Sequence, residues 1–270
     1  MVDVTEDPDG APGLNRLTAD EANLRASIGS LAGLVADHRG LPQLLAEVAS
    51  FAVGAIPGAD GAGVALLNVD RVDNIVAALA ASEPFVAEID EIQYVLLNEG
   101  PCITAARERR TVRSGSLGGE KMWPRFGPRV GRLGVHSALS VPLLLPDRVV
   151  GAINVYAYGK DVFDVHAAEF GELFAKPAAV AVHNAQILSH AVTLSIQLQA
   201  ALSSRPVIDQ AIGIIRGRTG RSAEDAFTQL RLISQSEHRK LADVAKRIVD
   251  EAVRCARSRG SADPESTAAP

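Results

Sequence analysis

Two apolar runs with almost nothing between them place the strongest constraint on how this chain can fold. Residues 136–145 read HSALSVPLLL and residues 148–158 read RVVGAINVYAY, and only Pro146 and Asp147 separate them. Both runs are rich in residues that favour strands, and such a short turn makes neighbouring strands antiparallel. The pair therefore predicts an antiparallel hairpin.

The rest of the first 165 residues repeats this arrangement. Residues 61–69 and 72–82 predict a second strand pair, joined through Asp70 and Arg71. Helices are predicted at 41–56, 83–97 and 121–133, with a loop over NEGPC (98–102). Strands in adjacent pairs predict a mostly antiparallel sheet sandwiched by helices, a fold of the α+β class.

Composition narrows the class of protein. The chain has 270 residues, 47% of them hydrophobic, which is enough for two domains. Its two cysteines, Cys102 and Cys255, lie too far apart in sequence for a disulfide framework or a cysteine zinc cluster. It has no uncharged apolar run long enough to span a membrane, and its amino terminus is acidic. We therefore expect a cytoplasmic protein, with a flexible tail over 1–25 and a disordered one over 257–270.

Charge is unevenly distributed along the chain. Residues 195–260 contain twelve Lys and Arg against seven Asp and Glu, although the net charge of the whole chain is −5. A basic segment on an acidic body indicates that this segment meets a polyanion. Ordinary helical surface charge is the alternative.

A seven-residue apolar repeat predicts a coiled coil over 166–202. One set of positions holds Leu173, Val180, Ile187, Leu194 and Ala201, and a second set, four residues later, holds Pro177, Asn184, Ala191 and Leu198. We expect a homodimer through this helix. A single helix that packs on its own domain is the alternative.

Three short helices are predicted after the coiled coil. The first covers Ser204–Arg218, with a kink near Leu202–Ser203 or a new start capped by Ser204, because Pro206 disfavours an uninterrupted helix. Ser222 opens the second in a capping box with Asp225. The apolar face of the second helix is predicted to comprise Ala226, Phe227, Leu230 and Ile233, and that of the third Leu241, Val244, Ala245, Ile248, Val249 and Ala252.

These helices carry a motif that resembles the ANTAR domain, the RNA-binding output domain of bacterial antiterminators. The matching residues are Ser204, Arg205, Ile208, Ala211, Gly213, Ala226, Phe227, Leu230, Ser234, Leu241, Val244 and Ala245. Two positions depart from the pattern. Ile212 stands where the family usually has lysine, and His238 replaces an asparagine before the third helix, which exchanges a good helix cap for a poor one.

Upstream, NEGPCITA, MWPRF, HSALSVPL and VVGAINVY resemble the GAF sensory domains that precede ANTAR in actinobacterial regulators. The two resemblances imply a GAF domain over 26–165, the coiled-coil signalling helix over 166–202 and an all-α three-helix ANTAR bundle over 203–256. They also imply an RNA partner, paired hairpins in mRNA leaders, with RNA polymerase reached indirectly through the transcript.

The residues expected to contact RNA are of three kinds: arginines, whose guanidinium groups can pair with two phosphate oxygens, side chains that can hydrogen-bond, and a glycine that lets the backbone approach closely. They are Ser203, Arg205, Gln210, Gly213, Arg216, Arg218, Arg221, Ser234, Arg239 and Lys240. Arg216, Arg218 and Arg221 are expected to reach phosphates, whereas Arg205 and Gln210 are expected on a face that reads a loop base. Close helix packing is the alternative role of Gly213.

The GAF half gives weaker signals. Cys102, Trp123 and His136 lie in or beside loops that commonly border a GAF pocket, where an unknown small molecule could bind. The six histidines are scattered, GSLGGEK lacks the spacing of a phosphate-binding loop, and no nucleophile has an evident base. We therefore expect no catalytic residue, no metal, no cofactor and no membrane partner.

The sequence thus predicts a dimeric regulator that binds tandem hairpin loops in nascent mRNA. Two rival readings remain. In one, Ser222–Ile233 is the recognition helix of a DNA-binding helix-turn-helix. In the other, the chain is a GAF-fold enzyme or small-molecule receptor whose C-terminal helices only dimerise.

Overall fold

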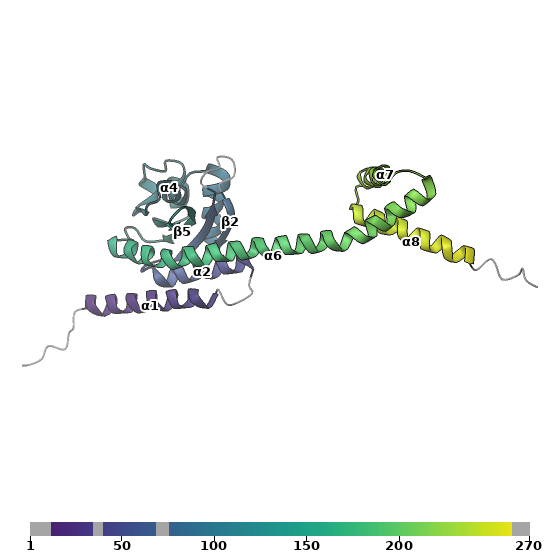
Figure 1. Cartoon of the computed structure of the whole chain (residues 1–270). Helices are drawn as coiled ribbons and strands as arrows, with labels where there is room; N and C mark the ends of the chain where they lie inside the picture. Colours follow the sequence, from purple (N-terminus) through teal and green to yellow (C-terminus); the bar gives the residue numbers. More distant parts are fainter. Residues whose placement is uncertain (1–11, 35–39, 69–75, 261–270) are drawn as a thin grey trace, which may run out of the picture. The chain divides into compact units, whose positions relative to one another are not determined.

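The computed structural model describes residues 12–34, 40–68 and 76–260, and the chain divides into two compact units between Ser189 and His190 (Figure 1). None of the described helices is long and apolar enough to cross a membrane.

A five-stranded antiparallel sheet forms the centre of the first unit, in the order β2-β1-β5-β4-β3. The strands are β1 (Gly61–Leu67), β2 (Val76–Ala81), β3 (Val112–Ser114), β4 (Ser137–Leu144) and β5 (Val149–Ala157). The β4–β5 hairpin pairs Ser137 with Ala157 and Leu143 with Gly151, as the two apolar runs predicted. The α+β class and the antiparallel sheet are confirmed; the Asp70–Arg71 connection lies outside the described residues.

Helices cover both faces of this sheet. On one face α2 (Leu41–Ala55) and the first part of α6 (Val165–Thr219) pack on residues such as Val64, Leu139 and Ile153, and α1 (Pro12–Leu34) packs against α2. On the other face lie α3 (Pro84–Asp90), the π-helix η1 (Glu91–Leu97), α4 (Pro101–Glu108), the short 3-10 helix η2 (Leu117–Gly119) and α5 (Phe126–Gly131). The sandwich predicted from the sequence is therefore present.

Helix α1 corrects the expectation of a flexible tail for residues 12–25, and residues 1–11 lie outside the described residues. Its residues Leu24, Ile28 and Leu31 recur at helical spacing, and Leu24 and Leu31 are buried in the same core as α2. Because this apolar stripe lies across the boundary drawn at residue 25, neither side of that boundary contained enough of it to predict a helix.

The second unit contains the end of α6, α7 (Ala223–Ser236) and α8 (Leu241–Gly260). Its buried core consists of Ala211, Ile215, Ala226, Leu230, Val244 and Ala245. Helix α8 continues through residues 257–260, which the sequence assigned to a disordered tail.

The expected new helix at Ser204 is wrong, since α6 is helical from Val165 through Thr219. Pro206 lacks only the one N–H that would bond to the carbonyl of Leu202, and the backbone on both sides stays helical. A second correction concerns Phe227, which was predicted on the apolar face of α7. It is 40% exposed and does not belong to the core.

Candidate nucleic-acid interface

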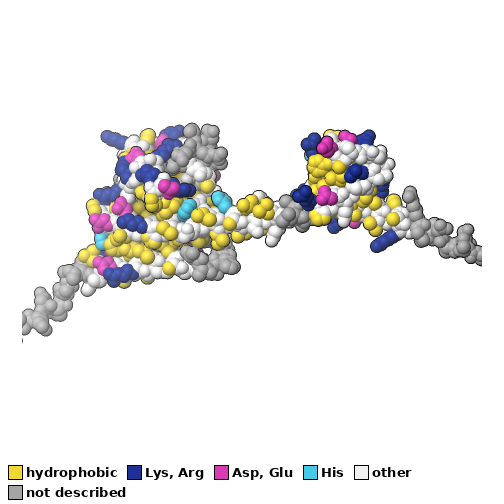
Figure 2. Space-filling model, viewed as in Figure 1, with side chains coloured by type: hydrophobic (Ala, Val, Ile, Leu, Met, Phe, Trp, Pro, Cys, Tyr) yellow, Lys and Arg dark blue, Asp and Glu magenta, His cyan; other side chains and the backbone are white. Residues whose placement is uncertain are grey.

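The core of the second unit decides which residues of α6 face outward. Ala211 and Ile215 are buried against α7 and α8, so the residues on the remaining sides of the helix are accessible. Arg205, Gln210, Arg216 and Arg218 are all exposed. In Figure 2 dark-blue Arg and Lys side chains lie around this unit beside apolar side chains.

The turn between α6 and α7 is held by local hydrogen bonds. Thr219 Oγ1 donates to the carbonyl of Ile215 at 2.8 Å, and Gly220 adopts a left-handed backbone with φ of 68°. Ser222 Oγ accepts from the Asp225 amide at 3.1 Å, which confirms the Ser222 half of the predicted capping box, and the Asp225 carboxylate accepts from the Ser222 hydroxyl at 2.7 Å. These hydrogen bonds hold the turn in which the exposed Arg221 lies.

Helix geometry separates two residues that the sequence grouped together. Gln210 follows Arg205 by five residues, which places their side chains about 140° apart around α6. Arg216 follows Arg205 by eleven residues, which brings them to within about 20° of each other. Arg205 therefore shares a face with Arg216, and not with Gln210.

Gln210 instead faces outward beside two glycines. Gly213 and Gly217 lie near it on the same side of α6, and a Cβ on either glycine would meet no atom within 4 Å. Close helix packing within the described chain is therefore not the reason for Gly213. The bare backbone leaves this side of the helix open to a partner.

The α7–α8 turn holds the remaining candidates. Ser234 Oγ donates to the Arg239 carbonyl at 2.6 Å, and the Arg239 amide donates back to the Ser234 carbonyl at 3.1 Å. Ser234 thus fixes the turn from which Arg239 and Lys240 project, both exposed. The side chain of Ser203 lies outside the described residues.

His238 has a different role from the one the sequence suggested. It does not cap α8, which begins at Leu241; it lies in the left-handed region, with φ of 52°, directly after Glu237 at the end of α7. Asparagine tolerates this conformation better than most residues. The asparagine usual at this position is therefore explained by backbone conformation rather than by helix capping.

The first unit contains a buried polar cluster that the sequence analysis missed. Asp90, Gln93 and Tyr156 are buried, and among the described residues Asp90 Oδ1, Gln93 Nε2 and Tyr156 Oη have no hydrogen-bond partner. Beside them Ser140 Oγ donates to Asn154 Oδ1 at 2.7 Å, and Gln93 Oε1 accepts from the Cys102 amide at 3.2 Å. The available signal was an Asp and a Gln at the same spacing as the apolar residues Val86 and Ile89.

Burial sets the protonation of this cluster. Desolvation raises the pKa of Asp90 to about 8 and that of the Cys102 thiol to about 12. Gly63 makes room for the acid, because a Cβ there would lie 3.2 Å from Asp90 Oδ2. Asp90 is therefore held as a neutral acid near neutral pH, and Cys102 as a thiol.

The three predicted pocket residues are not brought together at an open site. Cys102 is buried against β1 and β5, and Trp123 is buried, with its indole N–H donating to Thr104 Oγ1 at 2.9 Å. His136 is half-buried just before β4. Among the described residues no group of His, Cys, Asp and Glu is arranged to hold a metal ion.

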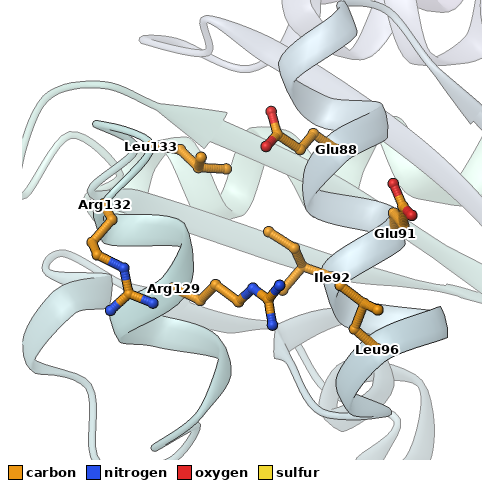
Figure 3. A pocket seen from close by; sticks show the side chains of 7 residues that line it. All are labelled: Glu88, Glu91, Ile92, Leu96, Arg129, Arg132 and Leu133. Carbon is orange, nitrogen blue, oxygen red and sulfur yellow. The ribbon is translucent and has the colours of Figure 1, made fainter.

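An open groove lies elsewhere on this unit, between α3–η1 and α5. Its volume is about 400 Å³. Figure 3 shows its lining, with carboxylates on one side and guanidinium groups on the other: Glu88, Glu91, Ile92, Leu96, Arg129, Arg132 and Leu133. None of the three predicted pocket residues lines it.

Comparison with known proteins identifies both units. The GAF domain model matches residues 38–183, and the ANTAR domain model matches residues 197–249. No curated protein matches the chain significantly.

Several solved structures are similar at low identity. The GAF domain of a phosphoenolpyruvate-protein phosphotransferase from Acinetobacter is 13% identical, with 62% of this chain and 97% of that chain covered and a TM-score of 0.46. The equivalent GAF domain from Coxiella burnetii is 15% identical, with 65% of this chain and 98% of that chain covered and a TM-score of 0.46. Free methionine-R-sulfoxide reductase from Neisseria meningitidis is 18% identical, with 61% of this chain and 91% of that chain covered and a TM-score of 0.46.

The GAF match covers more than half of the chain, and the ANTAR match covers the three-helix core with its two turns. The chain therefore belongs to the GAF domain family and is a GAF–ANTAR regulator, in which a sensory domain is followed by an RNA-binding antitermination domain.

Proposed function

We propose that the protein binds pairs of hairpin loops in nascent mRNA through its ANTAR domain. Capture of the hairpins holds the transcript in an antiterminator fold, so that RNA polymerase passes a terminator. The observation that carries this proposal is the set of exposed cations at two fixed turns: Arg216, Arg218 and Arg221 near the first, and Arg239 and Lys240 at the second. Cations on rigid supports suit phosphates flanking a loop whose bases are unpaired.

The side of α6 that faces away from its own domain supports a dimer. Phe170, Phe174, Ala178 and Val182 are buried against the sheet of their own domain. The heptad positions lie elsewhere on the helix, and Leu173, Val180, Ile187 and Leu194 are between 47% and 56% exposed. Packing on its own domain therefore accounts for only one apolar stripe, and a second copy over residues 166–202 would cover the other.

A dimer would present two ANTAR domains to one transcript. Binding of the second hairpin then becomes intramolecular, which raises avidity without any new contact per site. This is the physical reason why the proposed target is a pair of hairpins rather than one.

The buried polar cluster supports a sensory rather than a catalytic role for the GAF domain. A thiol whose pKa is raised to about 12 is a poor nucleophile at neutral pH, so Cys102 is not suited to reductase chemistry. The orphaned atoms of Asp90, Gln93 and Tyr156 offer hydrogen bonds to a small polar molecule if the covering helices move.

The DNA-binding alternative meets an electrostatic obstacle. A recognition helix reads bases with its N-terminal residues. The first turn of α7 carries Glu224 and Asp225, whose carboxylates would be brought close to DNA phosphates. The charge of α7 thus favours a partner that approaches from another side.

A competition experiment tests the proposal. The full chain is bound to a labelled tandem-hairpin RNA, and unlabelled hairpin RNA or duplex DNA of equal length is added. Displacement by RNA at much lower concentration than by DNA is expected. Equal displacement, or stronger displacement by DNA, would exclude RNA-hairpin recognition.

A further inference from the structure

Phe227 is exposed in a domain that has no other Phe, Tyr or Trp. Between residues 190 and 260 it is the only such residue in the sequence, and its side chain is 40% exposed on α7. Its neighbours Ala226 and Leu230 are fully buried in the core of the unit. An aromatic ring is therefore held at the surface by a helix whose orientation is fixed by other residues.

One cation follows Phe227 along the same side of α7, and two more lie in the turn after this helix. Arg231 lies one helical turn further on, and Ser234 lies two turns on. Ser234 Oγ holds the Arg239 carbonyl at 2.6 Å, so the exposed Arg239 and Lys240 stand at the end of this row. We call Phe227, Arg231, Arg239 and Lys240 the α7 strip.

Carboxylates limit the strip rather than interrupt it. Glu237 lies near its far end and pairs with Arg247 at 2.7 Å, which engages its charge. Glu224 lies one turn before Phe227. A phosphate chain that contacts the ring would therefore avoid the start of α7 and run toward Arg231 and Arg239.

We propose that Phe227 is a stacking platform for an unpaired RNA base, and that the cations of the α7 strip bind the phosphates on one side of that base. Every base has a π-face, and an exposed aromatic ring beside a row of Lys and Arg is the combination that binds single-stranded nucleic acid. This inference rests on the proposed RNA binding and names residues for it.

A second copy of the chain fits the strip less well than RNA does. The cores of protein interfaces are depleted in charge, whereas three cations accompany this single ring. Two copies placed symmetrically on the strip would bring like charges together, but RNA phosphates would neutralise them.

The test uses the full chain and a hairpin RNA with 2-aminopurine in its loop. Phe227→Leu keeps an apolar side chain that suits a helix but removes the ring. We expect affinity for the hairpin to fall about tenfold and the quenching of 2-aminopurine on binding to be lost. Phe227→Trp should retain both. Leu232→Ala is the matched control, since Leu232 is 57% exposed and lies about 140° away around α7.

The outcomes separate this inference from the proposed function. If wild-type protein fails to bind the hairpin, the proposed function fails, whatever the role of Phe227. If it binds and Phe227→Leu binds equally well with equal quenching, the stacking platform is wrong. If Phe227→Leu changes the oligomeric state by light scattering, or loses helical circular dichroism, Phe227 belongs to a protein interface or to the fold, and the inference is overturned.

Discussion

Replacing Asp90 by Asn should remove a loss of stability that the wild-type GAF domain undergoes as pH rises. The Asp90 side chain is 3% exposed, and among the described residues its Oδ1 has no hydrogen-bond partner. Burial raises its pKa to about 8, whereas the unfolded chain has the ordinary value of about 4. The folded domain therefore takes up a proton that the unfolded chain has lost throughout the window from about pH 4 to pH 8.

The sign and size of the effect follow from this difference. A protein that binds more protons when folded loses stability as pH rises, here by up to about 1.4 kcal/mol per pH unit within the window. Asn cannot ionise, so Asp90→Asn lacks this loss. The stability of the variant relative to wild type should rise between pH 5 and pH 8 by as much as about 4 kcal/mol.

Trp123 provides the assay. It is the only tryptophan in the chain and is buried in the GAF domain, so its fluorescence follows the unfolding of that domain in urea. Glu88→Gln, which removes an exposed carboxyl from the same helix, controls for the loss of a negative charge. A stability difference that does not change with pH, or an Asn variant that loses stability relative to wild type as pH rises, would refute the reasoning.

Three further predictions follow from the second unit and from α6. Leu194→Asp should convert a dimer to a monomer in light scattering, whereas Gln199→Asp, outside the heptad seam, should not; a monomeric wild type contradicts this. Arg218→Ala should weaken binding to every hairpin and reduce the log–log salt slope by about one, whereas Gln210→Ala should cost about 1–3 kcal/mol for the preferred loop only. Arg132→Ala, on the GAF surface, is the charge control. His238→Asn should raise the free energy of unfolding by up to about 1 kcal/mol in urea, because it relieves the left-handed backbone; a loss of stability refutes this.

Most of the fold could be predicted from patterns between residues that are close in sequence. The β4–β5 hairpin was predictable because strand preference and a two-residue turn both act between near neighbours. The Ser222–Asp225 cap is equally local. An uninterrupted helix through Pro206 was not predicted. The sequence shows the missing hydrogen bond, but it does not show that the backbone on both sides of Pro206 stays helical.

The sequence indicated which types of residue the candidate site contains, but not which of them are exposed or share a face. An apolar residue at helical spacing predicts burial, yet in the three-helix bundle Phe227 stays outside while Ala226 and Leu230 fill the core. Arg205 and Gln210 were grouped wrongly because their spacing of five residues already places them about 140° apart on any helix that contains both. Asp90 and Gln93 were missed because the sequence does not show which side of their helical segment is buried. Only burial distinguishes these two polar residues from ordinary surface residues.

Salt titration of affinity tests the central claim most directly. The full chain is titrated with one tandem-hairpin RNA and with a version whose loops are scrambled, at a series of salt concentrations. We predict binding that weakens steeply with salt for both RNAs, with a constant preference for the native loops. If neither RNA binds above the level of an unrelated acidic protein, or the two bind equally, the chain is not a reader of hairpin loops.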